Sequence, residues 1–496
     1  MSGDYAQLFR ALSSETALVL VALVALTLDL LAARKRELAA RRQIIGAVAL
    51  MGLALAAVPL VWQIGLTNAP LLGDTLVVNP LTVIFKFVLL VLTALTVLIS
   101  MDCDIGTHVG EYFAMLLFGT IGMLLLVSTE ELLTMFVALE LTSISLYVLA
   151  AFHKHALRSQ EAALKYFLFG AIASAFLLFG LSYIYGLTGA TNLREIGPAL
   201  AGKGTSPLLA LGLLCVLVGL GFKVAMVPFH LWAPDAYEGA PTPVTAFIAT
   251  GSKVASVFVL VKVLYIGFAG AAGSASWSGW QSGWAMLIGV AAMASMILGN
   301  FAAIVQRNVK RLLAYSSIAH AGYILVGLVA ASATGASSVL FYVIVYAITN
   351  LGAFGVVAAL SARAGGDAME NFDGMAKRAP FLSLLMLVFV LSLAGVPPLG
   401  GFFGKFYLFA AAVKADAEHF GLLWLVVLGI LMSAVSLYYY LVLLKHFYIH
   451  PAKDGSRIAT SPHVNVALAV CAAGVVALGV WPEPILALLN RLVLGL

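Results

Sequence analysis

The sequence predicts an all-α polytopic membrane protein, and three observations carry that prediction. Of the 496 residues, 62% are hydrophobic and only 10% are charged, whereas a soluble protein carries about 25% charged residues. The apolar residues gather in many runs of about 20 residues, which is the length that a helix needs to cross a bilayer. Such long runs favour helices over a membrane barrel, whose strands are much shorter.

About fourteen transmembrane helices are expected, joined by short loops. Their expected ranges are 16–33, 44–64, 77–100, 110–128, 131–152, 162–187, 206–230, 242–268, 283–305, 312–331, 337–361, 380–413, 421–447 and 464–482. The first run is followed by a basic cluster, whereas a cleaved signal peptide has its positive charge before the apolar run. We therefore expect this run to remain as the first helix.

The basic residues predict how the chain is oriented. Arg34, Lys35 and Arg36 follow the first expected helix, and further basic clusters recur in loops that fall on the same side. The loops on the other side hold few basic residues, among them Arg194 and Lys414. Because Lys and Arg collect on the cytoplasmic side, both chain ends are expected on the outer side of an energy-coupling membrane, such as the bacterial inner membrane.

The seventh and twelfth expected helices contain signs of a break. Pro228 lies in the seventh, and Gly395, Pro397 and Pro398 lie in the twelfth. Proline removes a backbone donor and clashes with the preceding turn. Each break falls in the fourth helix of a five-helix set, helices 4–8 and helices 9–13, and the odd number inverts the second set. Interrupted helices at matching places in two inverted repeats point to a transport path.

This organisation divides the chain into four parts. The expected parts are an N-terminal three-helix segment (1–108), a first five-helix repeat (109–268), a second inverted five-helix repeat (283–448) and a C-terminal helix (449–496). The connections between helices are short, so no soluble domain is expected. A large cofactor-binding domain therefore has no place in this chain.

Composition and motifs exclude several other functions. The net charge of +5 comes from basic residues in short loops and does not indicate nucleic-acid binding. Cys103, Cys215 and Cys471 lie far apart, so a disulfide framework, a zinc site or an iron–sulfur cluster is not expected. No metal-ligand spacing, nucleotide-binding glycine loop or catalytic triad stands out.

Five lysines stand inside apolar stretches, and no arginine does. They are Lys86, Lys223, Lys253, Lys262 and Lys405. A charge at the bilayer centre costs roughly 3 kcal/mol on insertion scales, and lysine, unlike arginine, shifts its pKa readily on burial. Lysines without arginines therefore predict sites that gain and lose a proton, and hence proton movement through a membrane.

Four residues are the main candidates for proton transfer. Glu140, about ten residues into the fifth helix, is expected to pair with Lys223 and hold it protonated until the pair weakens. Lys253 is expected to be a relay in a wetted cavity. Lys405 follows the second break and is expected to pass a proton toward the outer face. The structural alternatives are a static ion pair and, for Lys405, neutralisation of helix ends at the break.

Three further candidates carry weaker arguments. His320 takes the position of Glu140 in the second repeat and suits proton transfer near neutral pH, but a satisfied core histidine is the alternative. His230, at the inner end of the broken seventh helix, is a candidate guard of the proton entrance. Lys262 is a candidate for proton transfer, although its place near the outer end of its helix favours snorkelling to the interface.

The other charged residues are expected to be structural or solvated. Lys86 lies outside both repeats and is expected to pair with a neighbour. Asp29 is expected at the membrane interface, and Glu130 and Glu131 are expected to be solvated at an outer turn.

Three segments carry a resemblance to a known family. They are PFHLWAPDAYEGAPTPV (228–244), NVKRLLAYSSI (308–318) and GVPPLGGFFGK (395–405). They resemble the antiporter-like membrane subunits of complex I, the proton-pumping NADH:quinone oxidoreductase, over about helices four to thirteen. The YEGAP stretch at 237–241 and the lysine at 405 are more similar to the N-type subunits of that family than to the L and M types.

The resemblance implies a fold, a role and a set of partners. The fold would be the two inverted five-helix bundles, and the functional residues would be Glu140, Lys223, Lys253 and Lys405. The role would be one proton channel of the membrane arm, beside other antiporter-like and small subunits and a peripheral redox arm. NADH, FMN, iron–sulfur clusters and quinone would then belong to partner subunits. The alternatives are an Mrp-type cation/proton antiporter subunit and a scaffold subunit without its own channel.

Overall fold

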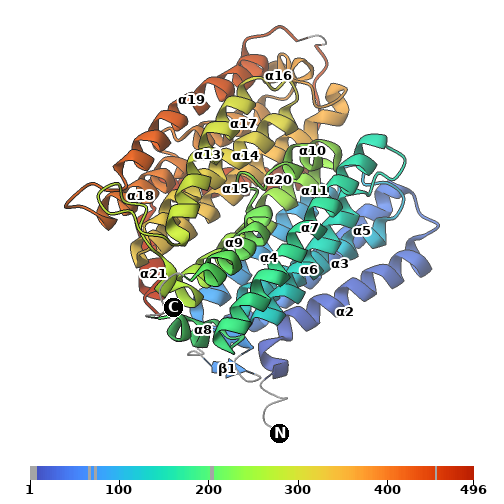
Figure 1. The fold of residues 1–496 in the computed structure, drawn as a ribbon. Coiled ribbons are helices and arrows are strands. Elements are labelled where there is room, and N and C mark those ends of the chain that lie inside the picture. Colours follow the sequence, from blue (N-terminus) through green and yellow to red (C-terminus); the bar gives the residue numbers. More distant parts are fainter. Residues whose placement is uncertain (1–7, 65–68, 72–74, 202–205, 453–454, 496) are drawn as a thin grey trace.

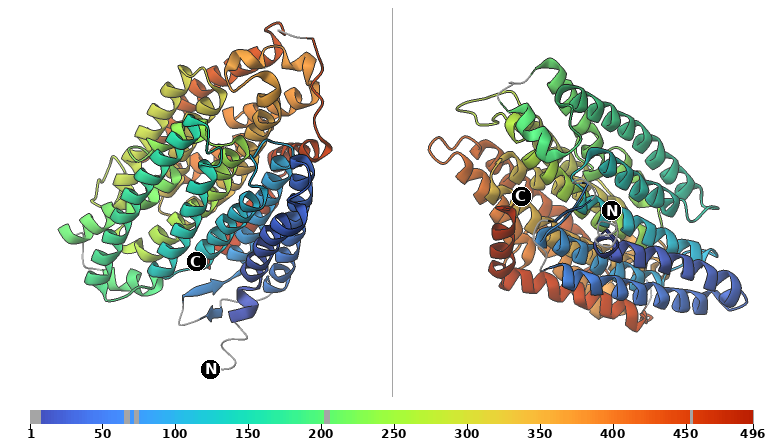
Figure 2. Two further views of the ribbon diagram at one scale, coloured as in Figure 1. Left: turned by 90° about the vertical axis from the view of Figure 1, so that its right-hand side faces the viewer. Right: turned by 90° about the horizontal axis from the view of Figure 1, so that it is seen from below.

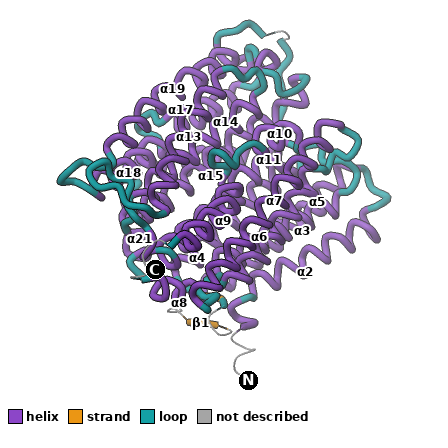
Figure 3. The backbone as a smooth tube through the Cα atoms, in the orientation of Figure 1, coloured by secondary structure: helices purple, strands orange, loops and turns teal. Residues whose placement is uncertain are grey.

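A computed structural model of the chain describes residues 8–64, 69–71, 75–201, 206–452 and 455–495. Helices dominate it, and the long ones run side by side in one bundle (Figures 1 and 3). In the described part, 13 helical segments are long and apolar enough to cross a membrane. The remaining expected crossing, 380–413, is divided into two shorter helices. The prediction of an all-α membrane protein with about fourteen crossings is confirmed.

The N-terminal part contains three crossings and a small hairpin. The crossings are α2 (Ser13–Leu28), continued by the π-helical turn η1 (Asp29–Ala33), then α3 (Leu38–Gln63) and α4 (Pro80–Ser100). Between α3 and α4, strands β1 (Ala69–Leu71) and β2 (Leu76–Val78) pair antiparallel. Hydropathy did not predict this hairpin, because it is too short to carry a strand pattern of its own.

The next part holds the first expected five-helix set. Its elements are α5 (Val109–Ser128), α6 (Leu132–Ala150), α7 (Leu157–Thr188), α8 (Leu193–Leu200), α9 (Pro207–Val224), α10 (Trp232–Gly239) and a continuous helical run of α11 (Thr242–Phe247), η2 (Ile248–Ser252), α12 (Lys253–Lys262) and η3 (Val263–Gly267). Two π-helical segments, η2 and η3, flank α12. Such π segments are frequent at functional sites.

The last part holds the second expected set and the C-terminus. Its elements are η4 (Ala269–Ala271), α13 (Trp284–Ile304), α14 (Val309–Val329), α15 (Ala333–Ala364), η5 (Met369–Phe372), α16 (Met375–Arg378), α17 (Pro380–Ala394), α18 (Gly400–Ala415), α19 (Leu423–Tyr448), α20 (Pro462–Val480) and α21 (Glu483–Val493). No helix was expected at α21, because this segment is too short and too polar to cross a membrane.

Both expected breaks are present, and the two helix ends are built alike. The helix α9 ends at Val224, so the expected seventh span (206–230) stops short, and the expected twelfth span is divided between α17 and α18. Ala225 (φ 58°) and Gly395 (φ 88°) take the left-handed conformation that ends many helices. At each end a backbone N–H reaches back five residues: Met226 to Gly221 and Val396 to Leu391, both at 3.0 Å.

Three crossings form the centre of the bundle. The segments Thr242–Gly267, Val309–Val329 and Ala333–Ala364 are buried almost throughout their length. By contrast, α2, α7 and α19 expose large apolar side chains, as helices at a lipid-facing rim do. The polar groups of the central helices therefore lie far from lipid, enclosed by other helices.

The start of the first crossing and the last helix lie toward the same end of the bundle (Figures 1 and 2). The helix α2 begins at the end near which α8 and α21 lie, whereas α10 and α16 lie toward the opposite end (Figures 1 and 2). This arrangement agrees with an even number of crossings. The expectation that both termini face the outer side of the membrane stays a prediction.

Candidate functional site

The five intramembrane lysines fall into two groups according to their partners. Lys86 belongs to the first group, because its Nζ lies 2.7 Å from Oε1 of Glu15 on α2, with both side chains at most 5% exposed. The expectation that Lys86 pairs with a neighbour is confirmed. Glu15 precedes the expected first span, so nothing in the sequence marked it as the partner.

Lys262 also pairs with a carboxylate. Its Nζ donates to the backbone oxygen of Thr129 at 2.8 Å and lies 3.5 Å from Glu130, and neither charged side chain is exposed. Glu130 also pairs with Arg194 at 2.7 Å. The predictions that Lys262 snorkels and that Glu130 is solvated are therefore wrong. Neighbouring helices cover this turn, and the buried Glu130 lies between the buried Lys262 and the partly exposed Arg194.

Asp29 is buried as well. Its side chain is 2% exposed and accepts two hydrogen bonds from Arg41, at 2.8 and 2.6 Å, and one from the backbone N–H of Gly110 at 3.0 Å. The prediction of an interfacial Asp29 is wrong, because α3 and α5 close over it. Glu131 is only 8% exposed and caps the first turn of α6 through the N–H groups of Leu133 and Thr134, so it is not a solvated surface residue either.

Lys223 belongs to the second group, whose partners are hydroxyls. It lies in the last turn of α9, and its Nζ donates to Oγ of Ser143 on α6. Glu140, three residues before Ser143, is half-buried and accepts a 2.5 Å hydrogen bond from Ser174 on α7. No ion pair joins Glu140 to Lys223 in the described chain, so the predicted pair is wrong. The carboxylate turns toward α7, and the hydroxyl one turn later takes its place.

Lys253 has a hydroxyl partner on a central helix. Its Nζ donates to the backbone oxygen of Ser317 at 2.8 Å and to its Oγ at 2.5 Å, and the lysine is 1% exposed. The hydroxyl of Tyr346 donates to the same Oγ at 2.8 Å, and Asn350 donates to Tyr346 at 2.8 Å. Lys253 therefore joins α12 to α14 and α15 through uncharged groups.

Lys405 reaches back across the second break. From α18, its Nζ donates to the last carbonyls of α17, those of Leu393 at 2.9 Å and Ala394 at 3.2 Å, and to Oγ of Ser433 on α19 at 2.8 Å. Cations stabilise the carbonyl end of a helix. These bonds fit the structural alternative, in which Lys405 neutralises the helix end at the break. Among the described residues the amine has no carboxylate partner.

His320 lies on α14, between Lys253 of α12 and Lys405 of α18. Its Nδ1 is 2.6 Å from the hydroxyl of Tyr342, and its Nε2 is 3.1 Å from that of Tyr440. Tyr323, three residues later, has its ring 4.7 Å from Nζ of Lys405. Residues three apart share a helix face, so Ser317, His320 and Tyr323 form a polar stripe from one lysine toward the other.

The space beside Lys253 that faces Val224, the residue after Lys223, is apolar. A void there is too narrow for a water molecule and is lined by Val224, Lys253, Val257, Leu260, Ala321, Ile324 and Leu325. This void leaves no room for water, and a wetted cavity around Lys253 stays a prediction. A proton that passes from Lys223 to Lys253 requires this apolar gap to open.

A polar cavity opens at the end of the bundle near α10. It has a volume of about 340 Å³, and its lining includes His153, Glu238, Lys310 and Asp367. Lys310 is 3% exposed and donates to the backbone oxygen of Ala240 at 2.7 Å. Lys310 lies inside the 308–318 segment, but no apolar run surrounds it to mark it as a buried charge. His230, the expected guard of the entrance, is buried but does not line this cavity.

An ion-pair cluster braces this end of the bundle. Arg311 donates to Asp235 at 2.6 Å and to Glu238 at 3.0 Å, and Lys165 donates to Asp235 at 2.7 Å. Partial burial alone would raise the pKa of the Asp235 carboxyl, but the hydrogen bonds from Lys165 and Arg311 outweigh it and hold that pKa below its ordinary value. The cluster joins α7 and α10 to α14.

The chain is similar to known membrane subunits over most of its length. Residues 129–435 match the model of a family described as NADH:quinone oxidoreductase/Mrp antiporter, transmembrane. NADH-quinone oxidoreductase subunit N 2 of Acidobacterium capsulatum is 45% identical over 488 residues, which cover 97% of this chain and 98% of that protein. Subunit N of Moorella thermoacetica is 43% identical over 82% of this chain and 84% of its own length.

Solved structures share the fold. A chain of respiratory complex I from Thermus thermophilus is 34% identical, with a TM-score of 0.78 and coverage of 96% of this chain and 98% of that one. A chain of the Mrp complex from Dietzia sp. has a TM-score of 0.82 over 97% of both chains, and at 21% identity it shows the fold alone. These matches confirm the resemblance, and the chain belongs to the family of antiporter-like membrane subunits shared by NADH:quinone oxidoreductases and Mrp antiporters.

Proposed function

We propose that this chain is the proton-translocating N-type subunit in the membrane arm of an NADH:quinone oxidoreductase. The protons move along Glu140, Lys223, Lys253 and Lys405, and quinone reduction in other subunits drives them. NADH, FMN, iron–sulfur clusters and quinone are bound by those partner subunits, which include the peripheral redox arm. The chain lies in the bacterial inner membrane with both termini outside. Family membership and the relatives named subunit N support this proposal.

One observation carries the assignment of the lysines. Lys223, Lys253 and Lys405 each donate to a serine hydroxyl, and no carboxylate lies within ion-pairing distance of them in the described chain. Lys86 and Lys262 instead have carboxylates beside them. A buried amine without a counter-ion has a neutral form close in free energy to its charged form, whereas an ion pair holds the charge. Lys223, Lys253 and Lys405 can therefore release a proton, whereas Lys86 and Lys262 stay charged.

The proposed proton path has two halves. Polar side chains can relay protons in one half, and an apolar gap closes the other. From Lys253 to Lys405 the stripe of Ser317, His320 and Tyr323 offers hydroxyl and imidazole groups that can accept and donate protons. Between Lys223 and Lys253 the lining is apolar and too narrow for water. In our proposal, redox chemistry in the partner subunits controls the opening of this apolar gap. Glu140, one turn from the hydroxyl that holds Lys223, is the charge best placed to bias that step.

Coupled proton uptake tests the proposal. The complex is assembled with Lys405→Ala in this chain, and uptake is measured in sealed vesicles during NADH oxidation by quinone. The matched control replaces both members of a buried ion pair, Glu15→Leu with Lys86→Met, because removing a whole pair leaves no unpaired charge. We expect uptake per assembled complex to fall for Lys405→Ala and to remain for the control. Equal uptake in the two variants would refute the proposal.

A further inference from the structure

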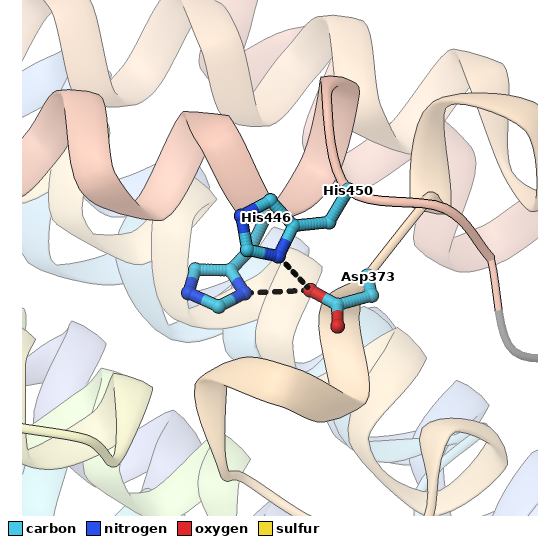
Figure 4. Close-up of side chains that lie close together, drawn as sticks. All are labelled: Asp373, His446 and His450. Atoms are coloured by element: carbon cyan, nitrogen blue, oxygen red, sulfur yellow. Dashed lines mark hydrogen bonds and ion pairs between the residues drawn. The ribbon is translucent and has the colours of Figure 1, made fainter.

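Two histidines and an aspartate from separate elements meet near α16 (Figure 4). His446 and His450 lie four residues apart at the end of α19, and Asp373 lies between η5 and α16. Oδ1 of Asp373 is 2.6 Å from Nδ1 of His446 and 3.4 Å from Nδ1 of His450. The three side chains are 14% to 33% exposed, so water and small ions reach them.

The residues on either side of Asp373 hold it against this turn of α19. The ring of Phe372 stacks on that of Phe447 with centroids 5.5 Å apart. The N–H of Gly374 donates to the backbone oxygen of His446 at 2.9 Å. The cluster is therefore fixed by contacts that do not involve its own side chains, and its three donor atoms lie within 4.8 Å of one another.

We propose that Asp373, His446 and His450 bind a divalent transition-metal ion of the zinc class. Zinc takes imidazole nitrogens and carboxylate oxygens at about 2.0–2.2 Å, in tetrahedral geometry. Such bond lengths place neighbouring ligand atoms about 3.3 Å apart. The His450–Asp373 separation meets this value, and the hydrogen-bonded His446–Asp373 pair opens by less than 1 Å. Three protein ligands leave the fourth position to water.

A simple ion pair explains less of this arrangement. A simple ion pair needs one histidine, as at Asp416, where Nδ1 of His419 lies 3.4 Å from Oδ1 and Ser276 and Ser278 donate to Oδ2. Here a second imidazole, that of His450 just beyond the end of α19, points to the same carboxylate oxygen. A convergent pair of imidazoles with a carboxylate is a ligand set. The His419–Asp416 pair lacks the second imidazole and serves as the control.

A bound ion would link the two helices that hold Lys405. Asp373 leads through α16 into α17, whose last carbonyls accept from Lys405. The helix α19 carries His446 and Ser433 and is followed directly by His450. An ion at the cluster would therefore fix α17 relative to α19 and slow proton transfer by Lys405. This consequence rests on the proposed function, whereas the binding of the ion does not.

Cobalt binding tests the site. Co²⁺ is titrated into the full-length chain in detergent, the visible absorption of the tetrahedral ion is followed, and Zn²⁺ is then added as competitor. We expect one ion per chain, displaced by Zn²⁺, and an affinity at least tenfold weaker for His450→Gln and Asp373→Asn. His419→Gln should bind as the parent chain does. The 33% exposure of His450 makes its variant the safer one for folding.

Two results would overturn the metal site. One is an unchanged Co²⁺ spectrum and affinity in His450→Gln, and the other is binding by the parent chain only at millimolar ion. Proton uptake by the assembled complex, with and without Zn²⁺, is measured separately. Binding without inhibition would reject the effect on Lys405 and leave the metal site standing.

Discussion

Side chains that look equivalent in the sequence differ in their partners. All five lysines sit in apolar stretches, yet Lys86 and Lys262 have carboxylate partners and Lys223, Lys253 and Lys405 have hydroxyl partners. The positions of these lysines were predictable because a charge inside an apolar run is conspicuous. Their partners were not, because a serine on a distant helix carries no signal in the sequence.

Lys262→Met should lower the amount of assembled complex without lowering the activity of each complex. It removes one of the two cations beside the fully buried Glu130 and leaves Arg194 as the other, and losing hydrogen bonds made by a charged group costs about 1.5–3 kcal/mol. Immunoblotting of membranes gives the amount, and NADH oxidation by quinone, divided by that amount, gives the activity.

Lys253→Met is the matched control for this prediction. Its partners are neutral, so it leaves no buried charge behind. We expect the opposite pattern, near-normal assembly with low activity per complex. A Lys262→Met complex that assembles fully but turns over slowly would mean that Lys262 transfers protons.

At the scale of secondary-structure elements, helix ends and the gaps between helices decide the proton path. The prolines and glycines predicted both breaks, because their backbone chemistry is local. The short helix α21 and the π-helical segments beside Lys253 were not predicted, because hydropathy does not record how the turns of a helix are hydrogen-bonded. The apolar gap between Lys223 and Lys253 arises from α9, α12 and α14 together, so no single segment contains it.

Ala321→Leu should slow coupled proton uptake without touching a titratable group. The larger side chain fills the void beside Lys253 and hinders its opening. Overpacking costs about 1–3 kcal/mol, so the amount of assembled complex is measured alongside. The conservative Ala321→Ser adds a hydroxyl at nearly the same volume and should preserve uptake. Normal uptake by assembled Ala321→Leu complex would show that protons do not pass through this void.

Substitutions at the two breaks should have opposite effects. Ala225→Gly removes a side chain from a left-handed residue and should stabilise the chain by about 1 kcal/mol, whereas Gly395→Ala adds one and should destabilise it by about 1–2 kcal/mol. A Cβ at 395 would also lie 3.3 Å from Cδ of Lys405. Thermal unfolding of the two variants in detergent compares them. Equal melting temperatures would contradict the claim that the left-handed backbone at these two positions affects the stability of the chain.

At the scale of the whole molecule, other helices surround a centre of three nearly buried crossings. Its class and most of its crossings followed from apolar runs of bilayer length, and the three quoted segments identified the family before any contact was known. The polar stripe of α14 depends on α12, α14 and α15 packing at the centre, and residues so far apart in sequence could not be placed together beforehand.

Proton uptake by the assembled complex should not require sodium. In the described part of the chain, Lys223, Lys253 and Lys405 have hydroxyl or carbonyl partners and no carboxylate cluster beside them. A sodium site needs several oxygen ligands around the ion. Uptake is compared in potassium and sodium buffers of equal ionic strength. Uptake that occurs only with sodium would favour the Mrp-type antiporter reading.

The central claim is that a proton crosses the membrane through the amine of Lys253. The most direct measurement is the initial rate of proton uptake in sealed vesicles carrying Lys253→Met complex, per assembled complex and beside the Glu15→Leu/Lys86→Met control. The account predicts a lower rate for Lys253→Met than for both the parent and the control. The same rate in all three would contradict it.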